Sequence, residues 1–137
     1  MSDEKRIYVI VPKTIQAPGV LETLDGRIER VLNVPMPAGR LMAQCAHVVS
    51  KMRCYKNVMT GVEFSPITTI VLSVRNSKEL AKTYRELSAL VPTYAFCDTN
   101  EPVYGTPAEQ LTALCTIPVL QSDVDDAIGH LELYAQI

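Results

Sequence analysis

Four polar side chains that carry hydrogen-bond donors recur at helical spacing in the stretch Pro37–Lys56, PAGRLMAQCAHVVSKMRCYK. They are Arg40, Gln44, His47 and Lys51, at positions i, i+4, i+7 and i+11, so they fall within an arc of about 60° on one side of a helix. A ridge of donors beside a helix start, whose free N–H groups attract anions, would suit an oxyanion or a phosphate. An ordinary solvated helix face is the alternative that the spacing leaves open.

The same stretch predicts a helix that packs on a hydrophobic core. Its apolar residues form a stripe at the spacing of one helix face: Leu41, Met42, Cys45, Val48, Val49 and Met52. Pro35 and Pro37 make a stiff entry to the helix, and Gly39 in the first turn offers a point of close approach. We therefore expect one helix to present both a buried face and the polar ridge.

The chain before this helix predicts a strand and a hairpin. Ile7–Val11 is a short apolar, β-branched run of the kind buried on both faces of a sheet. Val20–Leu24 and Arg27–Val31 alternate polar and apolar residues on either side of Asp25-Gly26, a dipeptide that favours a type I′ turn. We expect a β-hairpin within residues 12–36, with an irregular loop as the alternative.

The chain after the helix predicts alternating strands and helices. The expected strands are Ile67–Val74, Thr93–Cys97 and Leu111–Ile117, with a last extended piece at Leu131–Tyr134. One helix is expected to begin at Asn76 and to end before Pro92, with an apolar stripe at Leu80, Tyr84, Leu87 and Val91. A second, shorter helix is expected to begin at Ser122-x-x-Asp125 and to end at Gly129. This order predicts a single-domain α/β sandwich over residues 1–137, with a mixed sheet of about four strands and the hairpin as an insertion.

Composition sets the class of protein. The 137 residues are 47% hydrophobic, which suits a single hydrophobic core. The chain shows neither a long apolar run nor a charged and apolar leader. We therefore expect a cytoplasmic protein that does not enter membranes. The net charge of −2 argues against wholesale coating of nucleic acid. Residues 1–56 nevertheless carry nine Lys/Arg against five Asp/Glu, and residues 57–137 carry four against ten, so the two parts differ as +4 and −6. This asymmetry permits a basic surface around the helix.

Metal, disulfide and nucleophile chemistry find little support. The four cysteines Cys45, Cys54, Cys97 and Cys115 show no C-x-x-C spacing, so reduced, buried thiols are expected. The two histidines lack the spacing of metal ligands, and no Ser-His-Asp order, P-loop or Gly-rich dinucleotide turn is present. We expect no metal.

Asp98 and His47 each have both a chemical and a structural interpretation. Asp98 follows the expected strand Thr93–Cys97, and ligands of α/β sheets bind at the carboxyl ends of strands, so Asp98 is a candidate general base. An Asp that bonds its own backbone at a strand end is the structural alternative. His47 could donate to a substrate or be satisfied within the fold, and His130 has the character of a terminal or packing residue.

The segment Gly39–His47, GRLMAQCAH, resembles the Gly-Lys-x-x-x-Gln-x-x-His segment of type 2 peptidyl-tRNA hydrolases, the class typical of archaea and eukaryotes. Other parts are similar to that family as well: Phe96-Cys97-Asp98 to its strand-ending Asp, Gly105-Thr106 to its Gly-Thr/Ser, and Ile128-Gly129-His130-Leu131 to its terminal Gly-His-Leu. The likeness covers Ile7–Val11, Pro37–Lys56 and Ile67–Leu133.

The resemblance implies a homodimeric hydrolase that cleaves the ester between a peptide and the 3′ ribose of tRNA, or a related acylated substrate, without a cofactor. The catalytic positions would be Arg40, where the family has a lysine, Gln44 and Asp98: Asp98 orients or deprotonates water, and the helix residues stabilise the oxyanion. The residues expected to contact substrate are Gly39, His47, Lys51, Thr99 and Thr106.

Two other functions remain open. The first is a catalytically inactive family member that binds a nucleotide, an anion or a protein; it is favoured by Arg40 in place of lysine and by Pro102, where the family has a functional threonine. The second is a different hydrolase or transferase that uses the same pocket.

Overall fold

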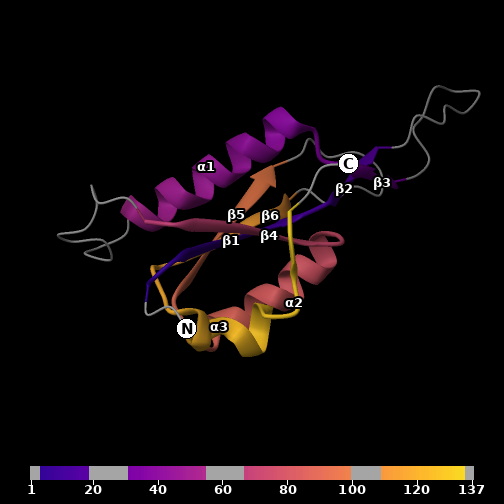
Figure 1. Ribbon diagram of the computed structural model, residues 1–137. Coiled ribbons are helices and arrows are strands. Elements are labelled where there is room, and N and C mark those ends of the chain that lie inside the picture. Colours follow the sequence, from indigo (N-terminus) through magenta and orange to yellow (C-terminus); the bar gives the residue numbers. More distant parts are fainter. Residues whose placement is uncertain (1–3, 19–30, 55–66, 100–108, 135–137) are drawn as a thin grey trace, which may run out of the picture.

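The computed structural model describes residues 4–18, 31–54, 67–99 and 109–134 (Figure 1). The strands are β1 Ile7–Pro12, β2 Thr14–Pro18, β3 Val31–Pro35, β4 Thr69–Val74, β5 Thr93–Thr99, β6 Glu109–Thr116 and β7 Glu132–Leu133. The helices are α1 Ala38–Cys54, α2 Ser77–Ser88 and α3 Gln121–Ile128. No helix among these described residues is long and apolar enough to cross a membrane.

The main sheet has five strands in the order β5-β6-β1-β4-β7, one more than expected. It is mixed, as predicted: β1 pairs in parallel with β4, whereas β6 runs antiparallel to both β1 and β5, and β7 runs antiparallel to β4. Strands β5, β1 and β4 therefore point the same way. Their carboxyl ends share one edge of the sheet, which is where α/β proteins place ligands.

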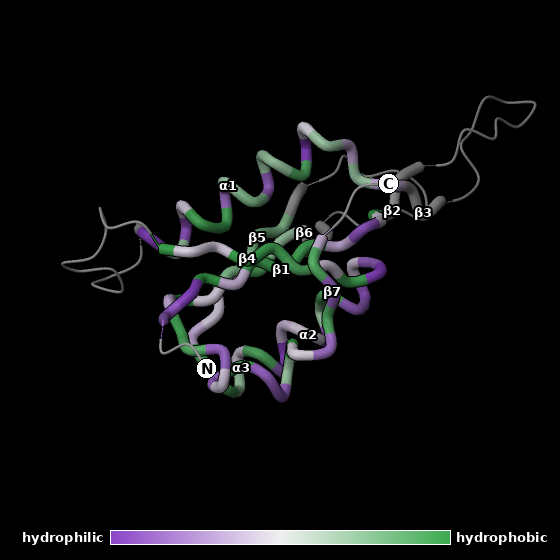
Figure 2. Tube along the Cα trace, in the orientation of Figure 1, coloured by the Kyte–Doolittle hydropathy of each residue, from purple (hydrophilic) through white to green (hydrophobic). Residues whose placement is uncertain are grey.

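The helices cover both faces of the sheet (Figure 1). Helix α1 packs on one face through Leu41, Val48 and Met52, against inward residues of β1 and β6. Helices α2 and α3 cover the other face through Leu80, Leu87 and a group on α3. All six residues of β1 are buried, because this strand lies at the centre of the sheet with a layer on either side, and Figure 2 shows it as mostly hydrophobic.

Strands β2 and β3, which follow β1 and precede α1 in the sequence, form a separate antiparallel sheet. The register runs from Thr14 opposite Pro35 to Pro18 opposite Val31. The predicted hairpin strands Val20–Leu24 and Arg27–Val31 and the Asp25-Gly26 turn lie, except for Val31, outside the described residues. The pairing thus brings together residues 14–18 and 31–35, which lie on either side of that segment in the sequence. Ile15 and Met36 belong to the same core cluster.

The helix ends confirm one predicted cap and correct another. Asn76 caps α2 by accepting a hydrogen bond from the Glu79 backbone N–H at 3.0 Å, as its spacing predicts. The helix stops at Ser88, however, and not at Pro92. The prediction that Ser122 opens α3 is wrong: the helix begins at Gln121, and the Asp123 carboxylate accepts from the Leu120 N–H at 3.1 Å. An acid in the first turn does the capping that the sequence assigned to a serine.

Helix α1 is turned slightly from the orientation that its apolar stripe predicts. Met42, placed in the buried stripe, is 72% exposed, whereas Gln44, placed on the polar ridge, is only 5% exposed. At 100° per residue, the buried direction set by Leu41, Val48 and Met52 lies about 60° from Gln44 and about 100° from Met42. The sheet therefore covers the glutamine and leaves the methionine outside.

Candidate active site

Gln44 is held beneath the helix by a buried threonine of the sheet. The Thr112 hydroxyl lies 2.8 Å from the Gln44 side-chain oxygen, to which it donates, and 3.3 Å from the carbonyl oxygen of Phe96. Thr112 is fully buried. This hydrogen bond to the amide oxygen fixes the orientation of the Gln44 side chain. The NH2 group of the amide can therefore donate to another acceptor.

Thr112 owes its position to an irregularity between β5 and β6. Phe96 pairs with Ala113 and Cys97 pairs with Leu111, so Thr112 is the extra residue of a β-bulge. Such a bulge re-aims a side chain, and here the side chain reaches across the sheet face to Gln44. Sequence reasoning missed Thr112 because the register slip that frees it depends on how two distant strands pair.

The other ridge residues line up along β5. The ring of His47 stacks on the ring of Phe96, with centroids 4.9 Å apart and planes 21° from parallel. Lys51 Nζ donates to the carbonyl oxygen of Ala95 at 2.8 Å. His47 and Lys51 are both exposed, as a polar ridge should be. Phe96 was not among the predicted site residues, although it directly precedes the Cys97-Asp98 pair.

These contacts give α1 a direction relative to β5. Lys51, near the carboxyl end of α1, contacts Ala95. Gln44, nearer the amino end, contacts Thr112 in the bulge, which lies further along β5, between Phe96 and Cys97. The amino end of α1 thus lies toward the carboxyl end of β5, and Figure 1 shows the tip of the β5 arrow beneath that half of the helix.

The backbone of Asp98 belongs to this end of β5. It pairs with Gln110, so the strand continues through Thr99 rather than ending at Cys97 as predicted. Two residues separate Asp98 from Phe96, a rise of about 7 Å along the strand. The side chains of Asp98 and Thr99, and the whole of Thr106, lie outside the described part of the chain.

Arg40 and Gly39 lie in the first turn of α1. Arg40 is half-buried and stands one helical turn before Gln44. Gly39 is exposed, and among the described residues no atom lies within 4 Å of the place a Cβ would take. The close approach expected at Gly39 is therefore not made by any part of the fold that the structure describes.

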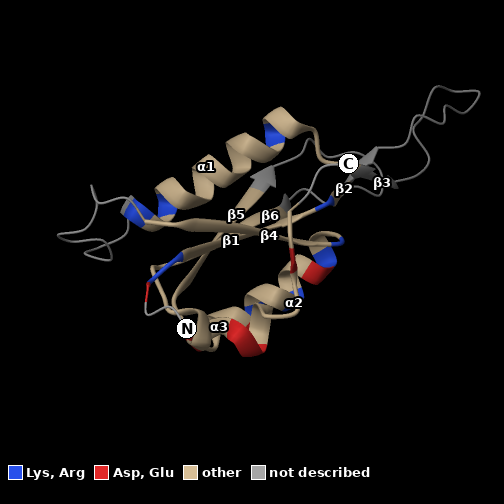
Figure 3. Cartoon of the chain, viewed as in Figure 1, with Lys and Arg blue, Asp and Glu red and all other residues tan. Residues whose placement is uncertain are grey.

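The helices α1 and α3, which lie on opposite faces of the sheet, differ in charge. Helix α1 carries Arg40, Lys51 and Arg53 and no acidic residue, whereas α3 carries three Asp residues and no basic one. Figure 3 shows the blue, basic positions of α1 on one side of the sheet and the red, acidic positions of α3 on the other. A polyanion would approach the α1 side, although the net charge of the whole chain is −2.

The cysteines differ in environment more than expected. Cys115 is buried, Cys45 is half-buried, and Cys97, expected in the core, is exposed. Burial raises the pKa of the Cys115 thiol to about 12, despite the nearby Arg53, and burial also raises the pKa of Cys45. Neither thiol is therefore a nucleophile at neutral pH. In the described ranges, no group of three His, Cys, Asp or Glu side chains could hold a metal ion.

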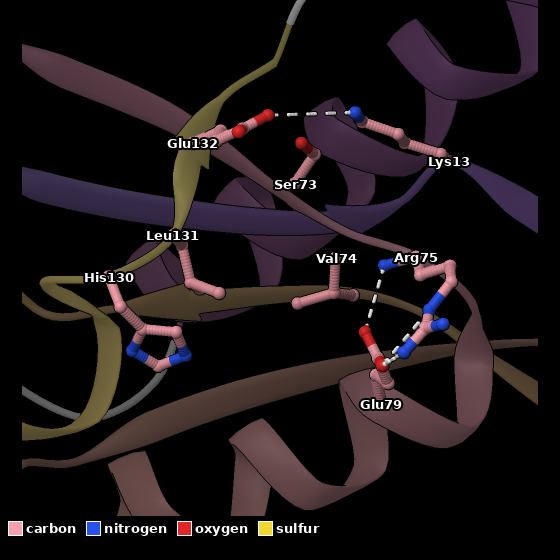
Figure 4. Close-up of a pocket in the computed structure, with 8 residues that line it drawn as sticks. All are labelled: Lys13, Ser73, Val74, Arg75, Glu79, His130, Leu131 and Glu132. Carbon is pink, nitrogen blue, oxygen red and sulfur yellow. Dashed lines mark hydrogen bonds and ion pairs between the residues drawn. The ribbon is translucent and has the colours of Figure 1, made fainter.

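A pocket of about 370 Å³ opens at the carboxyl end of β4, and none of the predicted site residues lines it (Figure 4). Its charged groups neutralise one another. Lys13 lies 3.9 Å from the Glu132 carboxylate, and Arg75 pairs with Glu79, whose pKa this hydrogen-bonded guanidinium lowers. Because each basic side chain of this lining is paired with an acidic one, the pocket does not favour a polyanion. His130, expected to be a terminal or packing residue, is exposed at its rim.

The fold and the ridge together define an α/β protein in which a donor-bearing helix lies over an edge strand whose last residues include Asp98. A family model, Peptidyl-tRNA hydrolase PTH2, matches residues 29–134. The matched range takes in the three helices that the structure describes and its strands from β3 onward. The chain belongs to this peptidyl-tRNA hydrolase family. No curated protein matches the chain.

Proposed function

We propose that the protein hydrolyses the ester bond that joins a peptide, or a related acyl group, to the 3′ ribose of tRNA. Family membership supports the reaction class. The observation that carries the proposal for this chain is the hydrogen bond from Thr112 to Gln44, since it holds a donor amide on α1 beside the strand that leads to Asp98. A fixed donor costs no reorganisation when charge develops on a substrate oxygen.

In the proposed reaction, Asp98 orients a water molecule and takes its proton as the water oxygen bonds to the ester carbonyl carbon. The carbonyl oxygen becomes an oxyanion, which the Gln44 amide and the Arg40 guanidinium stabilise. When the intermediate collapses, the bond to the ribose oxygen breaks and the proton on Asp98 passes to that oxygen. The products are a peptide acid and tRNA with a free 3′ hydroxyl.

The remaining candidate residues would hold the substrate. No part of the fold that the structure describes fills the space beside Gly39 in the first turn of α1, where the N–H groups suit a phosphate. Lys51 and His47 extend the same surface along β5. Thr99 and Thr106 are proposed to supply hydroxyl contacts near Asp98. The absence of acidic residues from α1 supports the approach of tRNA on this side.

The proposal includes the setting in which the enzyme works. It acts without a cofactor or a metal, because water, a carboxylate and fixed donors suffice for ester hydrolysis. We also propose that it is a cytoplasmic homodimer, and that residues 12–36 are an insertion in a single domain. Light scattering on the purified protein would give twice the mass of the 137-residue chain, and a monomer would contradict the dimer.

The test is release of the N-blocked amino acid from an N-blocked aminoacyl-tRNA. We expect turnover by the wild type, its loss in Asp98→Ala, and wild-type rates in Asp126→Ala, a matched change of an exposed acid on α3. Arg40→Lys tests whether the family's ammonium can replace the guanidinium, and we expect it to remain active because lysine is the residue that the family has at this position. Full activity of Asp98→Ala would refute the assignment of Asp98.

A binding protein without turnover is the second candidate, favoured by Arg40 and Pro102 as departures from the family sequence. It predicts no release by either the wild type or Arg40→Lys, together with retention on immobilised RNA that falls steeply with salt. Hydrolysis by the wild type would exclude it.

A further inference from the structure

The stacked rings of His47 and Phe96 form a rigid, solvent-facing aromatic surface beside the proposed catalytic residues. The ring of Phe96 is half-buried, and the imidazole of His47 lies over it while remaining exposed. One face of the imidazole is thus occupied by a hydrophobic ring, which fixes its plane. We propose that the exposed ring of His47 is the stacking platform for the nucleobase of the 3′-terminal nucleotide of tRNA.

The position of His47 fits this role if the proposed hydrolysis, on which the inference rests, takes place at Gln44. His47 follows Gln44 by three residues, a rise of about 4.5 Å along the helix. The ester at Gln44 would be carried by the ribose, and the base is attached to that same ribose. A ring one turn further along α1 therefore meets the base while the carbonyl stays beside the amide.

The neighbouring charge also suits a nucleotide. Lys51 lies one turn beyond His47 and uses one of its three ammonium protons on the carbonyl oxygen of Ala95. That bond holds the ammonium against the β5 edge on the same ridge as the stacked rings. A base on His47 would thus have a cation beside it for the phosphate backbone, the usual combination in binding sites for single-stranded nucleic acid.

A purely structural role for His47 makes a different prediction. If the ring only shields Phe96 from water, replacing it would lower stability and leave nucleotide binding unchanged. Stacking is tolerant of ring chemistry, so His47→Phe should preserve a platform that His47→Ala removes. His130→Ala is the matched control, because that histidine is also exposed but follows α3, which covers the face of the sheet opposite α1.

The experiment uses a short RNA ending in CC and a 3′-terminal 2-aminopurine, whose fluorescence falls when the base stacks. We expect the wild type, His47→Phe and His130→Ala to quench the probe, and His47→Ala to bind it about 10- to 100-fold more weakly with little quenching. On N-blocked aminoacyl-tRNA, His47→Ala should raise KM and leave kcat nearly unchanged, because stacking is made in both the ground and the transition state.

The outcomes separate the platform from the chemistry. Hydrolysis by the wild type without quenching, or equal affinity of wild type and His47→Ala, would overturn the platform and leave the hydrolase proposal standing. A fall in kcat at unchanged KM would also overturn it, since His47 would then act on the reacting atoms. Quenching that depends on His47 in a protein without turnover would support the platform and refute the proposed hydrolysis.

Discussion

The change Thr112→Val removes one hydroxyl from the centre of the proposed site and changes little else. Valine has nearly the same shape as threonine, so the fully buried position keeps its packing. The Gln44 oxygen, on a side chain that is 5% exposed, loses the donor that lies 2.8 Å away. Leaving a buried acceptor unsatisfied costs about 1–3 kcal/mol, so we expect the free energy of unfolding to fall by that amount.

Urea denaturation measures this loss, and a double-mutant cycle assigns it. Thr112→Val and Gln44→Leu should couple by about 0.5–3 kcal/mol, because the second change removes the group that the first leaves unpaired. Thr112→Ser is the control: it keeps the hydroxyl and loses one methyl group, at about 1 kcal/mol, without coupling to Gln44. Additive effects in the cycle would refute the claim that Thr112 holds Gln44.

The same variant tests positioning in catalysis. If Thr112 acts by orienting the Gln44 amide toward the oxyanion, Thr112→Val should lower kcat by about tenfold at nearly unchanged KM, whereas Thr112→Ser keeps most of kcat. An effect on stability with kcat unchanged would leave Thr112 a structural residue only.

Three further changes test the fold and its electrostatics. Leu41→Ala should lower the free energy of unfolding by about 2–5 kcal/mol in urea, whereas Met42→Ala, at a side chain that is 72% exposed, should change it by less than about 0.5 kcal/mol; equal losses would contradict the observed face of α1. Asn76→Ala should lower the free energy of unfolding by about 1 kcal/mol by removing the cap of α2, and Asn76→Asp should retain it; no difference between the two would count against the cap. Because burial raises the pKa of Cys115 from 9.0 to about 12, the native state keeps a proton that the unfolded state loses, so this contribution is complete below pH 9 and declines as pH rises toward 12. The advantage of the wild type over Cys115→Ala, measured by urea unfolding at several pH values, should therefore shrink across that range, and a constant difference would show that the thiol does not titrate as described.

Much of the fold can be predicted from local pattern. The buried run at Ile7–Val11, the helix after Pro37 and the cap at Asn76 each follow from a few neighbouring residues, and the structure confirms all three. The sheet order and the bulge at Thr112 do not follow in this way, because they depend on pairing between segments far apart in the chain.

Part of the candidate site was also predictable from local pattern. The spacing of Arg40, Gln44, His47 and Lys51 predicts a shared helix edge, and the contacts of the last three all reach β5 or its partner Thr112. Hydrophobic periodicity alone could not show that Gln44 is buried, since a polar side chain at the border of the stripe goes inward only when the sheet offers it a donor.

The measurement that tests the central claim most directly is the single-turnover rate of ester cleavage on N-blocked aminoacyl-tRNA, for the wild type and for Asp98→Asn. Asparagine keeps the shape of the side chain and removes the base. The account predicts cleavage by the wild type well above the spontaneous rate and a decrease of about 10²- to 10⁴-fold in the variant, the usual contribution of a positioned general base. A wild-type rate equal to spontaneous hydrolysis, or equal rates for the two proteins, would contradict it.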